Sequence, residues 1–399
     1  MKTRTLIGIV AAIAVLSLIF FLKSWNQSGD FKLNRPALSS GELREVIADS
    51  TDWLRAAQEK NGHFRYEYMP FLDRYVSDDN MVRQAGSLFV LGEILKADAN
   101  DKLKLSGTIE KSLAYFENNS LSLSFNDRNF RCVQTKKGEC GLGASSLAVV
   151  GAIDLVSANP QLSERYSALI KDYIEYILAS RNPSAGFRNT IFSDDSKDDT
   201  SESSFSNGEA FLALAKYYEM TKNPEIKQLL DEVYIYFENL YGENFDNNFY
   251  LWGMAAVKLL NQIEPSDKYF DFVKSYTDNR IRPVKRKRNL TRNRCAYIEG
   301  VTSAYSVLEG KLSEREKENY LEEINTWLSK SAELQVKDDD KLQLQYNNRE
   351  TEKLEITNSA RAAGGFLTDF SEPVQRIDFT QHCVSAFLQK LVDIDREAL

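Results

Sequence analysis

The sequence contains few of the side chains that hold metal ions. Among 399 residues there are only 4 cysteines and 2 histidines, and no two cysteines have the C-x-x-C spacing. Structural zinc sites use closely spaced Cys and His ligands. The acidic stretch that begins at Asp194 lacks the glycine and the final glutamate of a calcium-binding loop. We therefore expect neither a metal nor a cofactor, and we interpret this stretch as a solvated loop.

The chain also lacks an excess of positive charge. Its net charge is −8, which argues against nucleic acid as a partner. The exception is a basic run, Arg282-PVKRKRNLTRNR, which ends at Arg294. This run indicates either an anionic ligand nearby or simply a solvated loop. The hydrophobic fraction of 43% and the aromatic fraction of 11% are ample for a large core.

One long apolar run is present, from Leu6 to Leu22, preceded by Lys2 and Arg4. No small-x-small cleavage site follows it, so an uncleaved signal anchor over residues 1–23 is favoured over a cleaved signal peptide. Positive charges on the short N-terminal side of this run keep the N-terminus in the cytoplasm. We expect a single-pass protein of the inner membrane, a tether over residues 24–39, and a globular body in the periplasm or outside the cell.

The cysteines fit such an oxidising compartment. Cys132 and Cys140 flank a short polar loop that reads as a hairpin, and a disulfide between them is expected. Cys295 and Cys383 lie in small-residue helical segments, where an unpaired cysteine usually acts as a small buried apolar residue. A zinc site is the alternative for this second pair.

Six segments repeat one pattern, in which a small or polar start leads into an apolar helix rich in Gly, Ala and Ser. They begin at Asn80, Gly141, Ser206, Phe249, Cys295 and Phe379. Longer two-faced helical patterns alternate with them, which predicts about twelve helices in six hairpins. A repeat unit of this kind cannot bury its own apolar face. We predict an all-α (α/α)6 toroid over residues 40–399, with an apolar inner ring and an amphipathic outer ring, and we expect a monomer.

The connections on the two sides of this predicted ring differ in length. Four long ones precede inner helices: residues 61–79, 119–141, 181–205 and 336–373. The connections after inner helices are short. Long loops in compact domains usually bind ligands or act as lids, so the pocket should open at the N-terminal ends of the inner helices. Short β-hairpins are expected in the rim loops after His63 and Gly186.

Several polar residues occupy the first turns of the inner helices. Asp79 and Asn80 can cap the first of them, whereas Arg83 points from an apolar helix toward the ring centre and needs an anion. Glu209 is either a capping-box partner of Ser206 or a functional acid. Glu299 has no capping role available, so it is the strongest candidate for a functional carboxylate.

The last inner helix begins within Arg376-IDFTQHC. Asp378 can cap it, and Gln381 and His382 follow in the first turn. A lone histidine on an apolar helix is usually a core residue, but these polar neighbours make a site role for His382 equally plausible. Beside carboxylates, such a histidine can act as an acid or a base near neutral pH.

The phrases MVRQAGSLF, GLGASSLA, SNGEAFLALAKYYE, CAYIEG and RIDFTQH together resemble a poorly characterised family of bacterial and archaeal toroid proteins. The resemblance extends from about residue 62 to residue 387. It implies a fold similar to six-hairpin glycosidases, sugar epimerases and squalene-cyclase-like proteins, but no particular reaction. Matching the family's phrases strengthens Arg83, Glu209, Glu299, Asp378 and His382 as site candidates. The chain lacks the DxDD-type stretch of squalene cyclases and the zinc set of prenyltransferases, which weighs against an isoprenoid cyclase or prenyltransferase.

Two functional hypotheses follow. The first is a membrane-anchored carbohydrate-active enzyme, a hydrolase, lyase or epimerase, that acts on an anionic or envelope glycan. Its catalytic groups would be Glu299, Glu209 and His382, and its substrate would be bound by Arg83, Asp79, Asn80, Arg294, Asp378, Gln381 and Arg376. The second is a non-catalytic toroid that binds a glycan or a protein at the envelope, with Arg83 in a structural ion pair with Glu299 or Glu209.

Overall fold

The computed structural model describes residues 36–98, 100–194, 197–287, 293–337, 341–346, 350–371 and 373–399. The predicted anchor, residues 1–23, lies outside these ranges, as do residues 24–35 of the tether and residues 288–292 of the basic run. Within the described ranges, no helix is both long enough and apolar enough to cross a membrane. Residues 37–399 form one compact unit.

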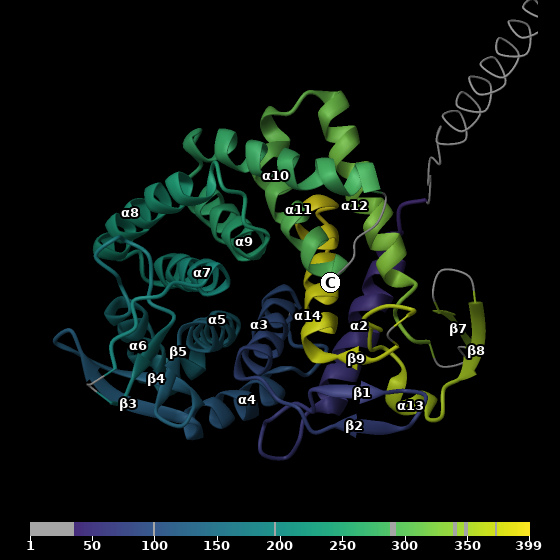
Figure 1. The fold of residues 1–399 in the computed structure, drawn as a ribbon, viewed down its shortest axis with the longest axis horizontal. Coiled ribbons are helices and arrows are strands. Elements are labelled where there is room, and N and C mark those ends of the chain that lie inside the picture. The colour runs from purple at the N-terminus through teal and green to yellow at the C-terminus, as the bar shows by residue number, and fades with distance from the viewer. Residues whose placement is uncertain are drawn as a thin grey trace, which may run out of the picture. The chain divides into compact units, whose positions relative to one another are not determined.

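Six helices form the inner ring. Each packs against the next, and the last returns to the first, because α14 contacts both α11 and α3. Figure 1 shows the inner helices surrounding the centre of this unit. They are α3 (Met81–Ala97), α5 (Leu142–Ala158), α7 (Ser204–Thr221), α9 (Asn247–Ile263), α11 (Arg294–Leu308) and α14 (Ile377–Gln389). The closed toroid predicted from the repeats is therefore present.

Six further helices pack outside this ring. They are α2 (Ser40–Ala57), α4 (Ser106–Asn118), α6 (Ser163–Ala179), α8 (Pro224–Tyr241), α10 (Lys268–Lys287) and α12 (Glu314–Ala332). In α8 the buried residues recur at helical spacing along one face, as in Ile226, Leu230, Val233 and Phe237. The other face carries polar and charged residues such as Glu225 and Glu232, which are exposed. This amphipathic pattern places the outer helices between the inner ring and solvent.

Small residues let the inner helices approach one another closely. In α5 every residue from Leu142 to Val156 is buried, so this helix has no solvent face. A Cβ added to Gly151 would lie 2.6 Å from Cγ of Leu88 on α3, which is too close for two carbon atoms. Glycine at this position is therefore what allows the close contact between α3 and α5.

Three small sheets form in the connections between the helices. The first has the strand order β2-β1-β9 and the second the order β3-β4-β5-β6, whereas β7 and β8 pair with each other alone. The strands are β1 (Glu67–Met69), β2 (Arg74–Val76), β3 (Ser120–Phe125), β4 (Arg128–Lys136), β5 (Glu139–Gly141), β6 (Thr190–Phe192), β7 (Lys341–Tyr346), β8 (Glu350–Glu355) and β9 (Gln375–Arg376). The hairpin expected after His63 is present as β1 and β2. The prediction of a hairpin after Gly186 is wrong, because the strand there, β6, pairs with β5 instead.

Two disulfides join the four cysteines. Cys132 on β4 is bonded to Cys140 on β5, as predicted. Cys295 on α11 is bonded to Cys383 on α14, with Cα atoms 4.6 Å apart. Sequence analysis treated this second pair as unpaired residues or zinc ligands, and that interpretation is wrong. The two residues are separated by 88 positions, and only closure of the ring brings their helices into contact.

Candidate functional site

A cavity of about 1140 Å³ opens where the inner helices begin. Its wall comes from the first turns of α3, α7, α9, α11 and α14, with Leu147 from α5 and two residues from the outer helix α10. The polar and charged lining residues are Asn80, Arg83, Ser203, Ser206, Glu209, Asn247, Asn248, Tyr250, Asn279, Arg280, Asn293, Tyr297, Asp378, Gln381 and His382. The pocket thus lies at the end of the ring that the long connections predicted.

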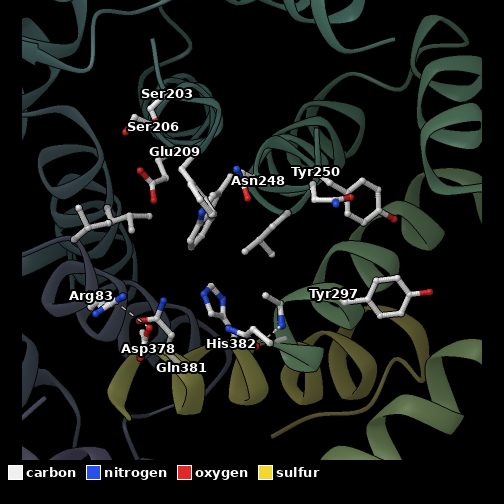
Figure 2. Close-up of a pocket in the computed structure, with 18 of the residues that line it drawn as sticks. Arg83, Ser203, Ser206, Glu209, Asn248, Tyr250, Tyr297, Asp378, Gln381 and His382 are labelled. Carbon is white, nitrogen blue, oxygen red and sulfur yellow. Dashed lines mark hydrogen bonds and ion pairs between the residues drawn. The ribbon is translucent and has the colours of Figure 1, made fainter. Parts of the chain in front are cut away.

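His382, at the wall of this cavity, forms a hydrogen-bonded pair with Glu299. The distance from His382 Nδ1 to Glu299 Oε2 is 2.8 Å. The side chain of Glu299 is 2% exposed, and it is not among the lining residues, whereas His382 is. Since Glu299 occupies Nδ1, the ring nitrogen available to the cavity is Nε2. Figure 2 shows the His382 ring extending from α14 into the cavity.

Glu209 lies across the cavity from His382 (Figure 2). It is 3% exposed, and its Oε2 atom is buried without a hydrogen-bond partner. Burial raises the pKa of Glu209 to about 8, because removal from water disfavours the charged carboxylate. A Cβ added to Gly143 would lie 2.1 Å from this Oε2, so glycine there leaves room for the carboxyl group.

The structure excludes the capping interpretation of Glu209. Helix α7 begins at Ser204, two residues earlier than the proposed cap, and Ser206 donates to Oδ1 of Asn189 at 2.7 Å. Glu209 therefore lies beyond the first turn and makes no capping-box contact with Ser206. Its raised pKa favours the protonated carboxyl group at neutral pH.

Arg83 is compensated by a protein carboxylate. Its Nε lies 3.2 Å from Oδ2 of Asp378, and it also donates to the hydroxyl of Tyr66. Asp378 in addition binds Arg376, at 2.9 Å to Nε and 2.5 Å to Nη2. The anion that sequence analysis required for Arg83 is thus Asp378, rather than Glu299 or Glu209. Asp378 lies in the first turn of α14 and makes no capping hydrogen bond.

The remaining predicted binding residues divide into two groups. Asn80 caps α3 through hydrogen bonds from Val82 N and Arg83 N, and it lines the cavity together with Gln381. Asp79, Arg294 and Arg376 are outside the lining. Asp79 accepts from Gln84 and pairs with His63, and Arg294 pairs with Asp369 at 2.7 Å.

Sequence reasoning missed an apolar and amide-rich part of the wall. Trp252 on α9 packs near His382, with ring centroids 5.7 Å apart, and Asn248 and Tyr250 come from the same helix. These residues follow the rule that located the other candidates, since they lie in the first turns of an inner helix. Arg280 does not, because it belongs to the outer helix α10. Tryptophan and tyrosine rings can pack against the apolar face of a bound molecule.

Together these groups can perform proton transfer. An imidazole held by a buried carboxylate can act as a general base, and a carboxyl group kept protonated by burial can act as a general acid. His382 and Glu209 meet these descriptions on opposite walls of one cavity. Among the described residues there is no cluster of three or more His, Cys, Asp or Glu side chains suited to a metal ion.

No family model matches the chain, and no curated protein matches it in sequence. Solved structures do share its fold. Cellobiose 2-epimerase from Spirochaeta thermophila is 11% identical with a TM-score of 0.61, over 90% of this chain and 96% of that one. A D-mannose isomerase is 11% identical with a TM-score of 0.60, over 90% and 99%.

A third similar structure is an inactive variant of an α-1,6-mannanase of glycoside hydrolase family 76 from Salegentibacter, in complex with α-1,6-mannotetrose. It is 12% identical with a TM-score of 0.61, over 88% of this chain and 99% of that one. That variant lacks two adjacent aspartates. At such identities the likeness concerns the fold alone, and it confirms the six-hairpin α/α toroid that the sequence resemblance implied.

Proposed function

We propose that this protein is a carbohydrate-active enzyme that transfers protons on a sugar bound in the cavity at the N-terminal ends of the inner ring. The observation that carries this proposal is the Glu299–His382 pair. His382 Nδ1 is hydrogen-bonded to Glu299 Oε2 at 2.8 Å, and the imidazole of His382 lies at the cavity wall. The fold of sugar epimerases, isomerases and mannanases supports a sugar as the ligand. Here His382 is the proton-transfer group, and Glu299 orients it.

The reaction that these groups fit best is isomerisation or epimerisation. His382 Nε2 would remove the proton from the carbon beside the carbonyl of an open-chain sugar, while Glu209 gives its proton to the carbonyl oxygen. The protonated His382 then returns a proton to a carbon of the resulting enediol, and an enediol hydroxyl returns one to Glu209 as the carbonyl forms again. Which carbon, or which face of the same carbon, is protonated determines whether an isomer or an epimer forms. Neither outcome requires a bond to be hydrolysed.

Glycoside hydrolysis is the second candidate, because a protonated glutamate such as Glu209 can act on a glycosidic oxygen. Hydrolysis usually needs a second carboxylate across the bond. Among the described lining residues the only other carboxyl group is Asp378, which is bound by Arg83 and Arg376. No adjacent pair of aspartates, like the pair removed in the inactive mannanase variant, lines the cavity within the described ranges.

The test combines a change of solvent with the chain's two histidines. The full-length protein is incubated in D₂O with mannose, cellobiose or α-1,6-linked mannotetrose, and NMR follows deuterium at the carbon next to the carbonyl as well as new reducing ends and unsaturated products. We expect deuterium incorporation that His382→Asn abolishes and His63→Asn leaves intact. His63 is the matched control, since it lies outside the cavity lining. New reducing ends without deuterium incorporation would favour a hydrolase. Binding of a sugar without turnover would favour a non-catalytic glycan-binding toroid.

We also propose that the enzyme is a single-pass protein of the inner membrane with its ring in the periplasm or outside the cell, acting as a monomer on an anionic or envelope glycan. The apolar run from Leu6 to Leu22 and its preceding positive charges support the anchor. The two disulfides support an oxidising compartment. Carbonate extraction of membranes tests the anchor, because release of the protein into the supernatant would contradict it.

A further inference from the structure

One arginine of the cavity wall, Arg280, has no carboxylate partner among the residues that the structure describes. Arg280 lies in the C-terminal half of α10, an outer helix that contacts both α9 and α11. It reaches the cavity between these inner helices. Its Nε atom is buried and has no hydrogen-bond partner, and no described carboxylate forms an ion pair with its guanidinium group. The other arginine of the lining, Arg83, is bound to Asp378.

The surroundings of Arg280 hold the cation in place without neutralising it. Its guanidinium carbon lies 5.1 Å from the centroid of the Tyr297 ring, a cation–π contact. The Tyr297 hydroxyl is directed elsewhere, because it donates to Oε1 of Glu323 at 2.7 Å. The tyrosine ring therefore supports the guanidinium, and its hydroxyl does not occupy the Arg280 N–H groups.

Amide side chains accompany this cation. Asn247 and Asn248 begin α9, Asn279 precedes Arg280 on α10, and Asn293 caps α11, and all four line the cavity. Their amide groups can donate hydrogen bonds to oxygen atoms, and none of them adds a negative charge. A guanidinium group with its fork of donors matches the oxygens of a carboxylate or a phosphate.

We propose that Arg280 binds an anionic substituent of the substrate, a carboxylate or a phosphate ester carried by the sugar. The proposal rests on the proposed function, in that it takes the cavity to be a sugar site. It assigns recognition of the anion to α10, at the side of the cavity formed by α9 and α11. In the inner ring of six helices, α9 lies opposite α3, which carries Arg83. Figure 2 shows Tyr250 and Tyr297 across the cavity from Arg83.

The test compares a neutral sugar with two acidic ones. Calorimetry on the full-length protein measures the affinities for mannose, mannuronate and mannose 6-phosphate. We expect at least one acidic sugar to bind about tenfold tighter than mannose. Arg280→Gln should abolish that preference. A preference for mannuronate identifies a carboxylate as the ligand. A preference for mannose 6-phosphate identifies a phosphate ester.

The control is the same substitution two residues further along α10, because Arg282 is exposed and outside the lining. Arg282→Gln should keep the preference. Arg280→Met, which keeps the packing on Tyr297, is the second variant if Arg280→Gln is poorly folded. Equal affinity for all three sugars in the wild type, or a preference that survives the loss of Arg280, would overturn the proposal.

Failure of the proposed function can be told apart from failure of this inference. If no sugar binds at all, the proposed function fails, and inorganic phosphate and sulfate then test Arg280 alone. A dissociation constant for either anion that rises about tenfold in Arg280→Gln, but not in Arg282→Gln, supports the anion site. Absence of binding by both anions overturns it.

Discussion

Cys295 is disulfide-bonded to Cys383 across α11 and α14, the two helices that carry Glu299 and His382. Cys383 directly follows His382 in the sequence, and Cys295 lies four residues, about one helical turn, before Glu299. Both cysteines are fully buried. The covalent bond therefore fixes the spacing of the two helices within one turn of the hydrogen bond on which the proposed reaction depends.

Removal of this disulfide should cost both stability and activity. For Cys295→Ser with Cys383→Ser we expect the free energy of unfolding to fall by about 4–5 kcal/mol, since a bond that closes a long loop restricts the unfolded chain most. Turnover of the sugar identified by deuterium exchange should fall as well, because the position of His382 relative to Glu299 loosens. Chemical denaturation and initial rates measure the two effects.

The second disulfide is the matched control. Cys132 and Cys140 are separated by only 8 positions and lie in the β4–β5 hairpin. The corresponding double serine variant should lose about 2–3 kcal/mol of stability and keep its turnover. Equal losses of turnover in both double variants would contradict a positioning role for the Cys295–Cys383 bond.

Glu299→Gln separates catalysis from structure, because glutamine keeps the shape of glutamate and removes its charge. We expect kcat to fall by about 10²- to 10⁴-fold, as His382 loses the carboxylate that fixes its tautomer. KM and the melting temperature should change little. The ¹⁵N chemical shifts of the His382 ring should report the altered tautomer independently of any substrate.

Glu323→Gln is the control for this change, since Glu323 is also a buried glutamate that accepts two hydrogen bonds, from Tyr297 and Trp327. It lies on α12 and does not line the cavity. A large loss of stability in Glu299→Gln with unaltered turnover would mean that the pair of Glu299 and His382 serves the fold rather than the reaction.

The ring could be predicted from sequence because its signal is repeated. Every inner helix carries the same apolar, small-residue pattern. Because every long connection leads into the N-terminal end of an inner helix, the end of the ring that holds the cavity could also be predicted. Arg83, Glu209 and His382 line it for that reason. Their partners could not be predicted, because Asp378 satisfies Arg83 only through side-chain directions that periodicity does not encode.

Two other features were out of reach for different reasons. The Cys295–Cys383 bond depends on how the last helix closes the ring, and four cysteines allow several pairings. Arg280 comes from an outer helix, whereas the repeated pattern of polar residues in the first turns belongs to the inner helices. Its proximity to the cavity depends on how α10 packs between α9 and α11.

A buried ion pair on the inner ring should matter for stability. Lys216 Nζ lies 2.9 and 3.0 Å from the two carboxylate oxygens of Asp154, and both residues are buried. Lys216→Met leaves an unpaired buried carboxylate, and we expect a loss of about 3–5 kcal/mol in the free energy of unfolding. The double variant Lys216→Met with Asp154→Leu should recover most of it. Denaturant titrations measure both, and a double variant no more stable than the single one would contradict this account.

The pH dependence of stability should reveal the raised pKa of Glu209. Burial moves its pKa from 4.5 to about 8, so between these values the folded protein holds a proton that the unfolded chain has released. Stability from this group is complete below pH 4.5 and is lost as the pH rises to about 8. Compared with the wild type, Glu209→Gln should therefore gain stability over this window, on the order of a few kcal/mol. Thermal unfolding of both proteins from pH 4 to pH 9 measures the difference.

The same group should set the alkaline limb of activity, because a general acid must be protonated to act. We expect kcat of the wild type to fall above about pH 8 and the residual activity of Glu209→Gln to show no such limb. Glu93 is the control, since burial raises its pKa to about 7 and it does not line the cavity. Glu93→Gln should shift the stability profile in the same direction and keep the alkaline limb. An alkaline limb that persists in Glu209→Gln would remove Glu209 from the reaction and leave His382 as the only proton-transfer group in the proposal.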